Sequence, residues 1–131
     1  MLDKAPVFAI VPCVDLERAA NFYGEVLGLE RAPMPGSEEQ PWAMVFACGQ
    51  GTRLLVYLRE MPTKADHTAA GWLVDDVNAV VDRLLAHGVT MEVYDMPGAE
   101  FDERGVATSG DIKSAWFKDT EGNILSVSES P

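Results

Sequence analysis

One pattern occurs twice in this chain of 131 residues: an apolar run, an acidic residue, an amphipathic stretch, a glycine and a second apolar run. The first copy runs from Val14-Asp15-Leu16 to Leu27-Gly28-Leu29, and the second from Val74-Asp75-Asp76 to His87-Gly88-Val89. Each copy indicates a strand, a helix with an acidic N-cap, a left-handed glycine and another strand. A chain of this length made of two such units is predicted to form one domain with a cleft built from paired halves.

Hydrophobic periodicity extends the first copy into a five-element unit. Apolar residues recur at helical spacing between Leu16 and Leu27, and Gly49-Gln50-Gly51 between two apolar runs indicates a hairpin. The predicted elements are a strand over 6–14, a helix over 16–27, a short strand over 29–33, a polar loop over 33–41 and strands over 42–48 and 52–58.

The second half repeats this order, so the prediction is β-α-β-β-β twice. After a linker over 60–68, the predicted elements are a strand over 69–74, a helix over 77–86, a strand over 89–94 and a final hairpin of strands over 112–118 and 124–128. The segment 96–110 is predicted to be a long loop rich in glycine and charge. A loop of this length indicates either a functional flap or simple disorder.

The charge of the chain argues against nucleic acid as a partner. There are 21 acidic residues against 10 Lys and Arg, which gives a net charge of -11. Binding to a phosphate backbone requires basic residues on the surface. Acidity is usually a solubility device, but it also favours cationic over anionic small molecules.

The chain shows no sign of a membrane or an export pathway. No apolar run approaches the roughly 20 residues needed to span a bilayer, and the N-terminus lacks a basic region followed by a long apolar segment. Cys13 and Cys48 lie in predicted strands without Cys-x-x-Cys spacing, so two buried reduced thiols are favoured over a disulfide. We therefore expect a cytoplasmic protein.

Two motifs resemble those of a known group. The run Val14-Asp15-Leu16-Glu17-Arg18-Ala19 with Phe22-Tyr23-Gly24-Glu25-Val26-Leu27-Gly28-Leu29 resembles the first module of the vicinal oxygen chelate superfamily. This group includes glyoxalase I, extradiol dioxygenases, fosfomycin-resistance enzymes and bleomycin-resistance proteins. The run Trp116-Phe117-Lys118-Asp119-Thr120-Glu121-Gly122-Asn123 resembles its closing hairpin, usually Phe-x-Asp-Pro-Asp-Gly-Asn, with Thr120 and Glu121 in place of Pro and Asp. Both motifs are turn and cap signals, so they identify a fold and leave the chemistry open.

The resemblance implies an α+β fold of two βαβββ modules that form a curled mixed sheet around a cleft. The single glyoxalase-like domain over 1–131 would consist of module 1 over 1–62 and module 2 over 68–131. The cleft is commonly completed in a dimer, so we expect a homodimer. In members that use a metal, four inward His, Gln or Glu side chains hold a divalent ion.

The resemblance also places those four metal positions, by offset from the motifs. The first-strand positions lie seven residues before the capping aspartates, and in this chain they are occupied by Phe8 and Ala69. The closing position, four residues after the turn glycine, becomes Ser126, and the remaining position falls near Val56 or Tyr57. A divalent ion requires several oxygen or imidazole donors. We therefore predict no metal site and no cofactor.

Some alternatives remain open. His67 precedes Ala69 by two residues and would become a ligand if the register shifted by two. His87 follows the second helix, where a cation suits the helix dipole. Four carboxylates in or beside the 96–110 segment could reach the cleft, although a solvated charged loop is the simpler interpretation. They are Asp95, Glu100, Asp102 and Glu103.

Strand alternation predicts which side chains line the cleft, because those with the parity of the lost metal positions face inward. Trp116 matches an inward aromatic position of glyoxalase-like proteins. The predicted ligand-binding residues are Phe8, Ile10, Trp42, Met44, Tyr57, Trp116 and Ser126. An apolar, aromatic pocket with a few polar groups is a common type of small-molecule site.

Two functions emerge as hypotheses. In the first, the protein binds a small aromatic or cationic molecule without a metal, like the bleomycin-resistance branch. In the second, it is a metal-dependent lyase or isomerase of glyoxalase type that uses unconventional ligands such as His67 and the loop carboxylates.

Overall fold

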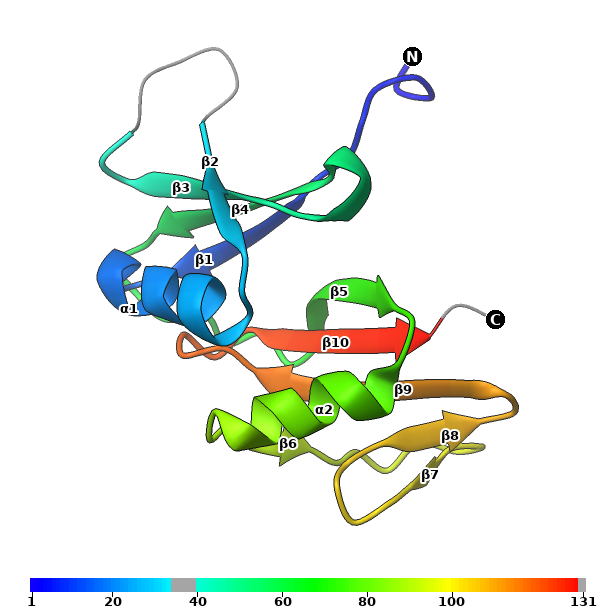
Figure 1. Cartoon of the computed structure of the whole chain (residues 1–131). Helices are drawn as coiled ribbons and strands as arrows, with labels where there is room; N and C mark the ends of the chain where they lie inside the picture. Colours follow the sequence, from blue (N-terminus) through cyan, green and yellow to red (C-terminus); the bar gives the residue numbers. More distant parts are fainter. Residues whose placement is uncertain (34–39, 130–131) are drawn as a thin grey trace. The chain divides into compact units, whose positions relative to one another are not determined.

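The chain divides into two compact units in the computed structural model, residues 1–63 and 64–131. The structure describes residues 1–33 and 40–129, so the predicted polar loop over 33–41 lies mostly outside the described residues. Each unit contains one sheet and one principal helix (Figure 1), which confirms the predicted α+β class. Within the described part of the chain, no helix is long and apolar enough to cross a membrane.

The first unit has the predicted βαβββ order. Its elements are β1 (Ala9–Cys13), α1 (Leu16–Asn21), the π-helical turn η1 (Phe22–Val26), β2 (Glu30–Ala32), β3 (Ala43–Ala47), the 3-10 turn η2 (Gly49–Gly51) and β4 (Arg53–Leu58). The sheet order is β1-β4-β3-β2, in which β1 and β4 run parallel and the other pairs are antiparallel. The strand predicted over 6–14 is observed as β1, which is shorter at both ends.

Capping residues set the bounds of the first helix. The Asp15 side chain accepts a hydrogen bond from the backbone N–H of Arg18 at 3.0 Å, as its sequence position predicts. The predicted single helix over 16–27 is observed as α1 continued by η1, and Gly28 follows with φ of +74°. The ring of Tyr23 on η1 lies 5.7 Å from that of Phe46 on β3. The helical segment therefore packs on one face of the sheet.

Strand alternation divides the first sheet into a covered face and an open face. The face that carries Phe46 also carries Val11, Leu54 and Val56, all at most 1% exposed. The opposite face presents Ile10, which is 52% exposed. The first unit therefore buries its core between the helix and one side of the sheet and leaves the other side uncovered within the unit.

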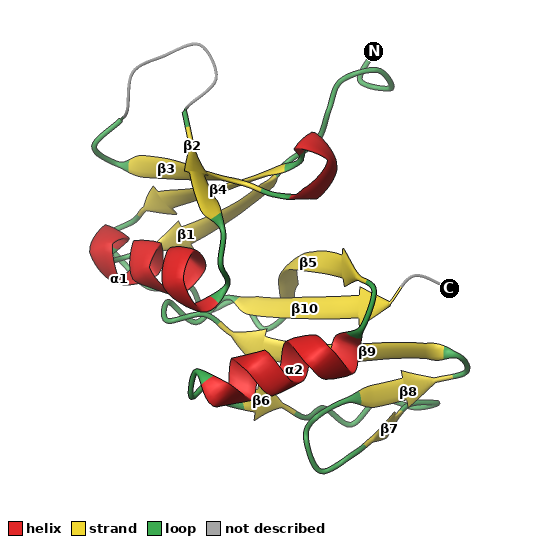
Figure 2. Cartoon of the chain, in the orientation of Figure 1, coloured by secondary structure: helices red, strands yellow, loops and turns green. Residues whose placement is uncertain are grey.

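The second unit repeats the order with an additional hairpin. Its elements are β5 (Thr68–Val74), α2 (Val77–Ala86), β6 (Met91–Glu92), β7 (Glu100–Phe101), β8 (Ala107–Ser109), β9 (Ile112–Lys118) and β10 (Ile124–Glu129). The sheet order is β5-β10-β9-β8-β7, and β6 also pairs with β9 (Figure 2). As in the first unit, the first strand pairs in parallel with the last strand. The βαβββ pattern is therefore present in both halves.

The second helix is held by side chains at both ends of the sequence unit. Asp76 accepts a hydrogen bond from Ala79 N at 3.1 Å, so the cap is Asp76 and not Asp75. Glu129 Oε2, at the end of β10, accepts from Val77 N at 2.9 Å. The helix has the predicted bounds, 77–86. A carboxylate at a helix N-terminus is favoured by the free N–H groups and the helix dipole.

The segment 96–110 differs from the predicted loop, since it contains the hairpin β7–β8. Its turn is closed by Asp102, whose Oδ1 accepts from Arg104 N at 2.8 Å and from Val106 N at 2.9 Å. The Arg104 guanidinium also donates to Asn78 and Asp82 on α2. These contacts anchor the hairpin turn to the helix. The hairpin was not predicted because strands of two and three residues are too short to show a hydrophobic period.

The predicted strand over 89–94 is likewise shortened, to Met91 and Glu92. Both cysteines are present as thiols, as predicted, but only one of the two is buried in a strand. Cys13 is buried, whereas Cys48 is half-buried.

The closing turn between β9 and β10 is built around a buried carboxylate. Asp119 is 7% exposed, and its Oδ1 accepts from the backbone N–H groups of Glu121 and Asn123, each at 2.8 Å. Its Oδ2 accepts from Asn123 Nδ2 at 2.7 Å. These bonds satisfy the donors of the turn and hold β9 and β10 in register.

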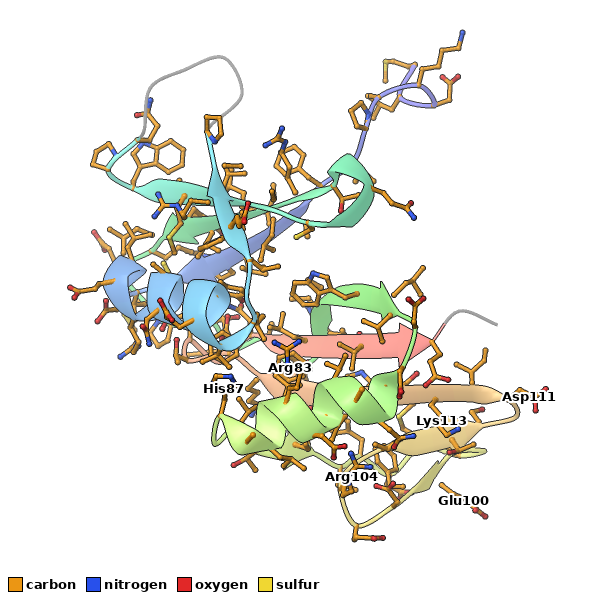
Figure 3. All side chains as sticks on the ribbon, in the orientation of Figure 1. Arg83, His87, Glu100, Arg104, Asp111 and Lys113 are labelled. Atoms are coloured by element: carbon orange, nitrogen blue, oxygen red, sulfur yellow. The ribbon has the colours of Figure 1, made fainter. Side chains whose placement is uncertain are left out.

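We predict that Asp119→Ala lowers the free energy of unfolding by about 2–4 kcal/mol, because buried donors lose a charged acceptor. The measurement is urea unfolding followed by circular dichroism. Asp111→Ala is the matched control, since Asp111 is exposed at the turn between β8 and β9 (Figure 3), and it should change stability by less than about 0.5 kcal/mol. Equal effects of the two variants would contradict this account of the turn.

A second prediction concerns Gly105 in the β7–β8 turn, which has φ of +84°. A Cβ at this residue would lie 2.8 Å from the Cβ of Met91, whereas Gly98, also at φ +84°, has nothing within 4 Å. Gly105→Ala should therefore be less stable than Gly98→Ala by about 1–3 kcal/mol, since both share the backbone strain and only one adds a clash. Indistinguishable unfolding midpoints for the two variants would show that the turn does not press on β6.

Candidate functional site

The open face of the first sheet brings together part of the predicted site. Ile10 pairs with Leu55, and Pro12 pairs with Tyr57, so these four side chains share one face. Phe8 precedes β1 and is 50% exposed. Ile10 and Tyr57 therefore lie on the same face of two adjacent strands, as members of one predicted site must.

The same register separates Met44 from Tyr57. Met44 pairs with Val56, lies on the covered face and is 4% exposed. The sequence expectation that Met44 and Tyr57 face the same way is not met, because antiparallel pairing places Ala43, not Met44, opposite Tyr57. Trp42 lies just before β3, is 48% exposed, and its carbonyl accepts from Leu58 N at 2.7 Å.

A pocket of about 710 Å³ lies at the end of β4. Its lining residues come from the end of β4, the segment after it and the residue after β1: Val14, Tyr57, Leu58, Arg59, Glu60 and Met61. The Arg59 backbone N–H donates to Cys13 O at 2.7 Å, which holds this segment beside β1. Tyr57 is thus the one predicted site residue that lines this pocket.

The open face of the second sheet carries the other two predicted residues. Ser126 on β10 pairs directly with Trp116 on β9, and Trp116 pairs with Glu92 on β6. Ser126 also pairs with Gly71 on β5, where a Cβ would lie 2.6 Å from Ser126 Oγ. The absence of a side chain at Gly71 therefore makes room for the Ser126 hydroxyl. Trp116, Ser126 and Glu92 form one contiguous row across this face.

Two further aromatic rings flank Trp116. The Tyr94 ring meets it edge-on with centroids 6.1 Å apart, and the Phe101 ring lies 5.9 Å away at a tilt of 42°. All three residues are half-buried. Such geometries favour aromatic association and leave partly exposed π surface for another ring or a cation. We define Tyr94, Phe101 and Trp116 as the aromatic cluster.

The Tyr94 hydroxyl is the polar group of this cluster. Its oxygen is buried and has no hydrogen-bond partner among the described residues. Burial raises the pKa of Tyr94, and the negative charge of Glu92 raises it further. The hydroxyl is therefore protonated at neutral pH. A buried hydroxyl without a partner costs stability, so it is a candidate group for binding a polar ligand atom.

Neighbouring polar groups of the same face have partners within the unit. The Ser114 and Ser128 hydroxyls are 2.9 Å apart and hydrogen-bonded. Lys118 Nζ lies 3.5 Å from Glu92 Oε1. This ion pair is partly exposed and weak. Glu92 therefore remains a carboxylate that a ligand cation can approach by displacing a lysine.

The four positions that the family resemblance assigns to metal ligands do not carry a set of donors for a divalent ion. Phe8 and Ala69 have no donor atom, Ser126 offers one weak hydroxyl, and Val56 and its neighbour Tyr57 lack a carboxylate or imidazole. Among the described residues, no group of three or more His, Cys, Asp or Glu side chains is placed to bind a metal ion. The donor chemistry of this chain thus disagrees with a divalent metal at the family positions.

The alternative ligands do not converge within the second unit. His67 is exposed, and its Nδ1 lies 3.3 Å from Thr68 O. His87 caps the C-terminus of α2, as predicted, with its backbone N–H directed to Arg83 O at 3.1 Å. Asp102 is engaged in the β7–β8 turn. The remaining loop carboxylates are exposed: Asp95, Glu100 and Glu103.

Sequence reasoning missed Tyr94, Phe101 and Glu92. Tyr94 and Glu92 share parity in the predicted strand over 89–94, which was a usable signal that they face the same way. Phe101 gave no signal, because it lies in a segment predicted to be a loop and reaches Trp116 only through the β7–β8 hairpin.

Solved structures of glyoxalase-type proteins have the same fold. A glyoxalase family protein from Bacillus anthracis is 18% identical, with both chains fully covered and a TM-score of 0.72. A lactoylglutathione lyase from Agrobacterium tumefaciens is 21% identical over 98% of this chain and 96% of its own, with a TM-score of 0.66. A fosfomycin resistance protein from Listeria monocytogenes is 13% identical over 98% and 94%, with a TM-score of 0.69.

These identities are too low to transfer an activity, so the structures show the fold alone. No curated protein sequence matches the chain. A family model, however, matches residues 7–127, which is nearly the whole chain and includes both motifs of the sequence. The protein is a member of the Glyoxalase/Bleomycin resistance protein/Dioxygenase superfamily.

Proposed function

We propose that this protein binds a small aromatic or cationic molecule at the aromatic cluster, without the help of a metal ion. The observation that carries the proposal is the placement of the Tyr94 ring beside Trp116, on a face that also carries Glu92, with the Tyr94 hydroxyl unpartnered among the described residues. Three partly exposed rings supply apolar contact area, and one hydroxyl supplies directionality.

The charge on this face supports a cationic or neutral ligand over an anionic one. Glu92 lies opposite Trp116 in the strand pairing, and its Lys118 partner at 3.5 Å is half-exposed and easily displaced. A cation above an aromatic face gains about 0.5–2 kcal/mol, and more when water is excluded. The net charge of -11 would add a favourable long-range field.

The donor chemistry supports a role in binding over metal-assisted catalysis. Metal-dependent isomerisation requires several oxygen or imidazole ligands around the ion, and the family positions here are Phe8, Ala69, Ser126 and the Val56–Tyr57 pair. The alternative is a glyoxalase-type lyase or isomerase with His67 as a ligand. A homodimer and a cytoplasmic location stay part of the proposal.

We predict that phenyltrimethylammonium binds saturably in isothermal titration calorimetry and that chelator does not change its affinity. Trp116→Ala should weaken binding by about tenfold or more, which corresponds to about 1.4 kcal/mol. Glu92→Gln should weaken the binding of phenyltrimethylammonium more than the binding of a neutral aromatic probe. Trp72→Phe is the matched control, because Trp72 pairs with Val127 on the opposite face.

The opposite results are equally clear. An absence of saturable binding across cationic and aromatic probes would overturn the proposed function. Glyoxalase turnover that disappears both on chelation and in His67→Ala would establish the metal-dependent alternative.

We predict that Tyr94→Phe separates stability from binding. Removal of a buried hydroxyl without a partner among the described residues should raise the free energy of unfolding at pH 7 by about 0.5–2 kcal/mol. The folded state raises the pKa of Tyr94 above its unfolded value. The linked free energy of unfolding is therefore constant below the unfolded pKa and falls as the pH rises from there through the folded pKa. Tyr94→Phe should therefore also flatten the alkaline decline of stability.

The same variant should weaken the bound probe if the probe carries a hydrogen-bonding group, as hydroxyphenyltrimethylammonium does. Binding and urea unfolding are measured on the same preparations. A loss of stability in Tyr94→Phe would mean that the hydroxyl has an internal partner, and it would remove the main support for the site.

A further inference from the structure

We infer that the pocket at the end of β4 is a separate site for a small monocarboxylate with an apolar body. This inference does not rest on the proposed function, because all of its lining residues belong to the first unit: Val14, Tyr57, Leu58, Arg59, Glu60 and Met61. The pocket volume of about 710 Å³ is within the usual range for small-molecule sites.

The cation of the pocket is Arg59. Its side chain is exposed, and within the described part of the chain it forms no ion pair. The Arg59 backbone N–H donates to Cys13 O at 2.7 Å, so the residue is attached to β1 and is not on a free loop. A guanidinium has five N–H donors in a fork that matches the two oxygens of a carboxylate.

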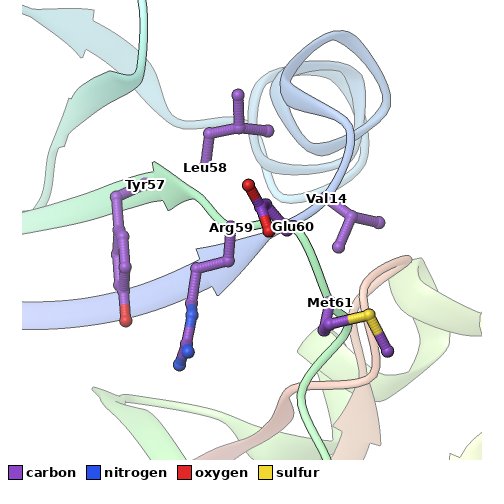
Figure 4. Close-up of a pocket in the computed structure, with 6 residues that line it drawn as sticks. All are labelled: Val14, Tyr57, Leu58, Arg59, Glu60 and Met61. Atoms are coloured by element: carbon purple, nitrogen blue, oxygen red, sulfur yellow. The ribbon is translucent and has the colours of Figure 1, made fainter.

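Tyr57 provides a second donor beside the guanidinium. Strand alternation puts Tyr57 and Arg59 on the same side of the chain, and Figure 4 shows the two side chains extending side by side in the same direction. The Glu60 carboxylate points the other way in this view. The phenol O–H and the guanidinium N–H groups can therefore bind the same anion, with Glu60 kept apart from it.

The other residues of the lining select the remainder of the ligand. Met61 lines the pocket and is 65% exposed, and Val14 adds a second apolar side chain to the lining, whereas Leu58 extends in the opposite direction from Tyr57 and Arg59 (Figure 4). Apolar surface of this kind gains about 25 cal/mol per Å² when a ligand covers it. A methionine side chain also adapts its shape to different ligands. The pocket thus suits an aliphatic or aromatic body.

The charge balance distinguishes a monocarboxylate from a phosphate or phosphonate. Arg59 and Glu60 together give the lining no net charge. The Arg59 guanidinium balances the charge of a monoanion, whereas a dianion keeps one uncompensated negative charge in a protein of net charge -11. We therefore assign benzoate and hexanoate as suitable probes and phenylphosphonate as a poor one.

The test is calorimetric titration of the full chain with benzoate, hexanoate, benzamide and phenylphosphonate at low and at physiological salt. Benzoate should bind saturably and at least tenfold more tightly than benzamide. Arg59→Gln should weaken benzoate binding by at least tenfold. Arg59→Lys should weaken benzoate binding less, because lysine keeps the positive charge and loses only the forked geometry of the guanidinium. Tyr57→Phe should weaken it by about threefold to tenfold.

The matched control is Arg53→Gln, at the start of β4 and with the same parity as Arg59, but outside the pocket lining. It should leave benzoate affinity unchanged, and so should Trp116→Ala, which tests the other site. All four changes at Arg59, Tyr57 and Arg53 affect exposed or half-buried side chains, so folding is verified by circular dichroism.

Three outcomes would overturn the inference. They are an absence of saturable carboxylate binding, equal losses in Arg59→Gln and Arg53→Gln, and a benzamide affinity equal to that of benzoate. A benzoate affinity that falls in Trp116→Ala but not in Arg59→Gln would assign the ligand to the aromatic cluster and would also overturn it.

Discussion

The parallel pairing of the first and last strands in each unit is the constraint on which the rest of the structure depends. A parallel connection needs a crossover, and here the crossover contains the helix, α1 or α2. The helix must bury its apolar stripe against one face of the sheet, where residues such as Phe46 and Phe117 are almost fully buried. The opposite face of each sheet is then free of its own unit's helix. Exposed apolar and polar side chains collect on that face for a topological reason, and a ligand can be bound there without disturbing the core.

Differences between the two units arise from the segments that come after their helices. In the second unit, the β7–β8 hairpin places Phe101 against Trp116, and Arg104 attaches the hairpin turn to α2. In the first unit, the segment after β4 instead brings Arg59 and Met61 to the pocket at the end of that strand. One face therefore has aromatic surface with an acidic neighbour, and the other has a guanidinium next to a phenol. The same fold thus presents two chemically different surfaces, which agrees with the general rule that function depends on the site and not on the scaffold.

Elements with strong local signals were predictable. Asp76 and Gly88 bracket the helix Val77–Ala86, and alternation of apolar residues defined the strand Ile112–Lys118, because caps and period are properties of neighbouring residues. The pairing of Trp116 with Ser126 is set by the closing turn between them. The face of Met44 was not predictable, because it depends on which residue of β3 lies opposite Tyr57. The β7–β8 hairpin was also missed, since its strands are too short for any period and its turn is held by a side chain of Asp102.

The sequence by itself determined the family and the two βαβββ units, and it predicted that Phe8, Ala69 and Ser126 occupy the positions of the usual metal ligands. These conclusions depend on residue identities and on local spacing. Only the tertiary structure decided that Tyr94 and Phe101 flank Trp116, that the Tyr94 hydroxyl is buried without a partner among the described residues, and that Arg59 extends beside Tyr57. Each of these depends on the register between strands and on the path of a loop. Many residues far apart in the chain set both together, so no single stretch of sequence contains the information.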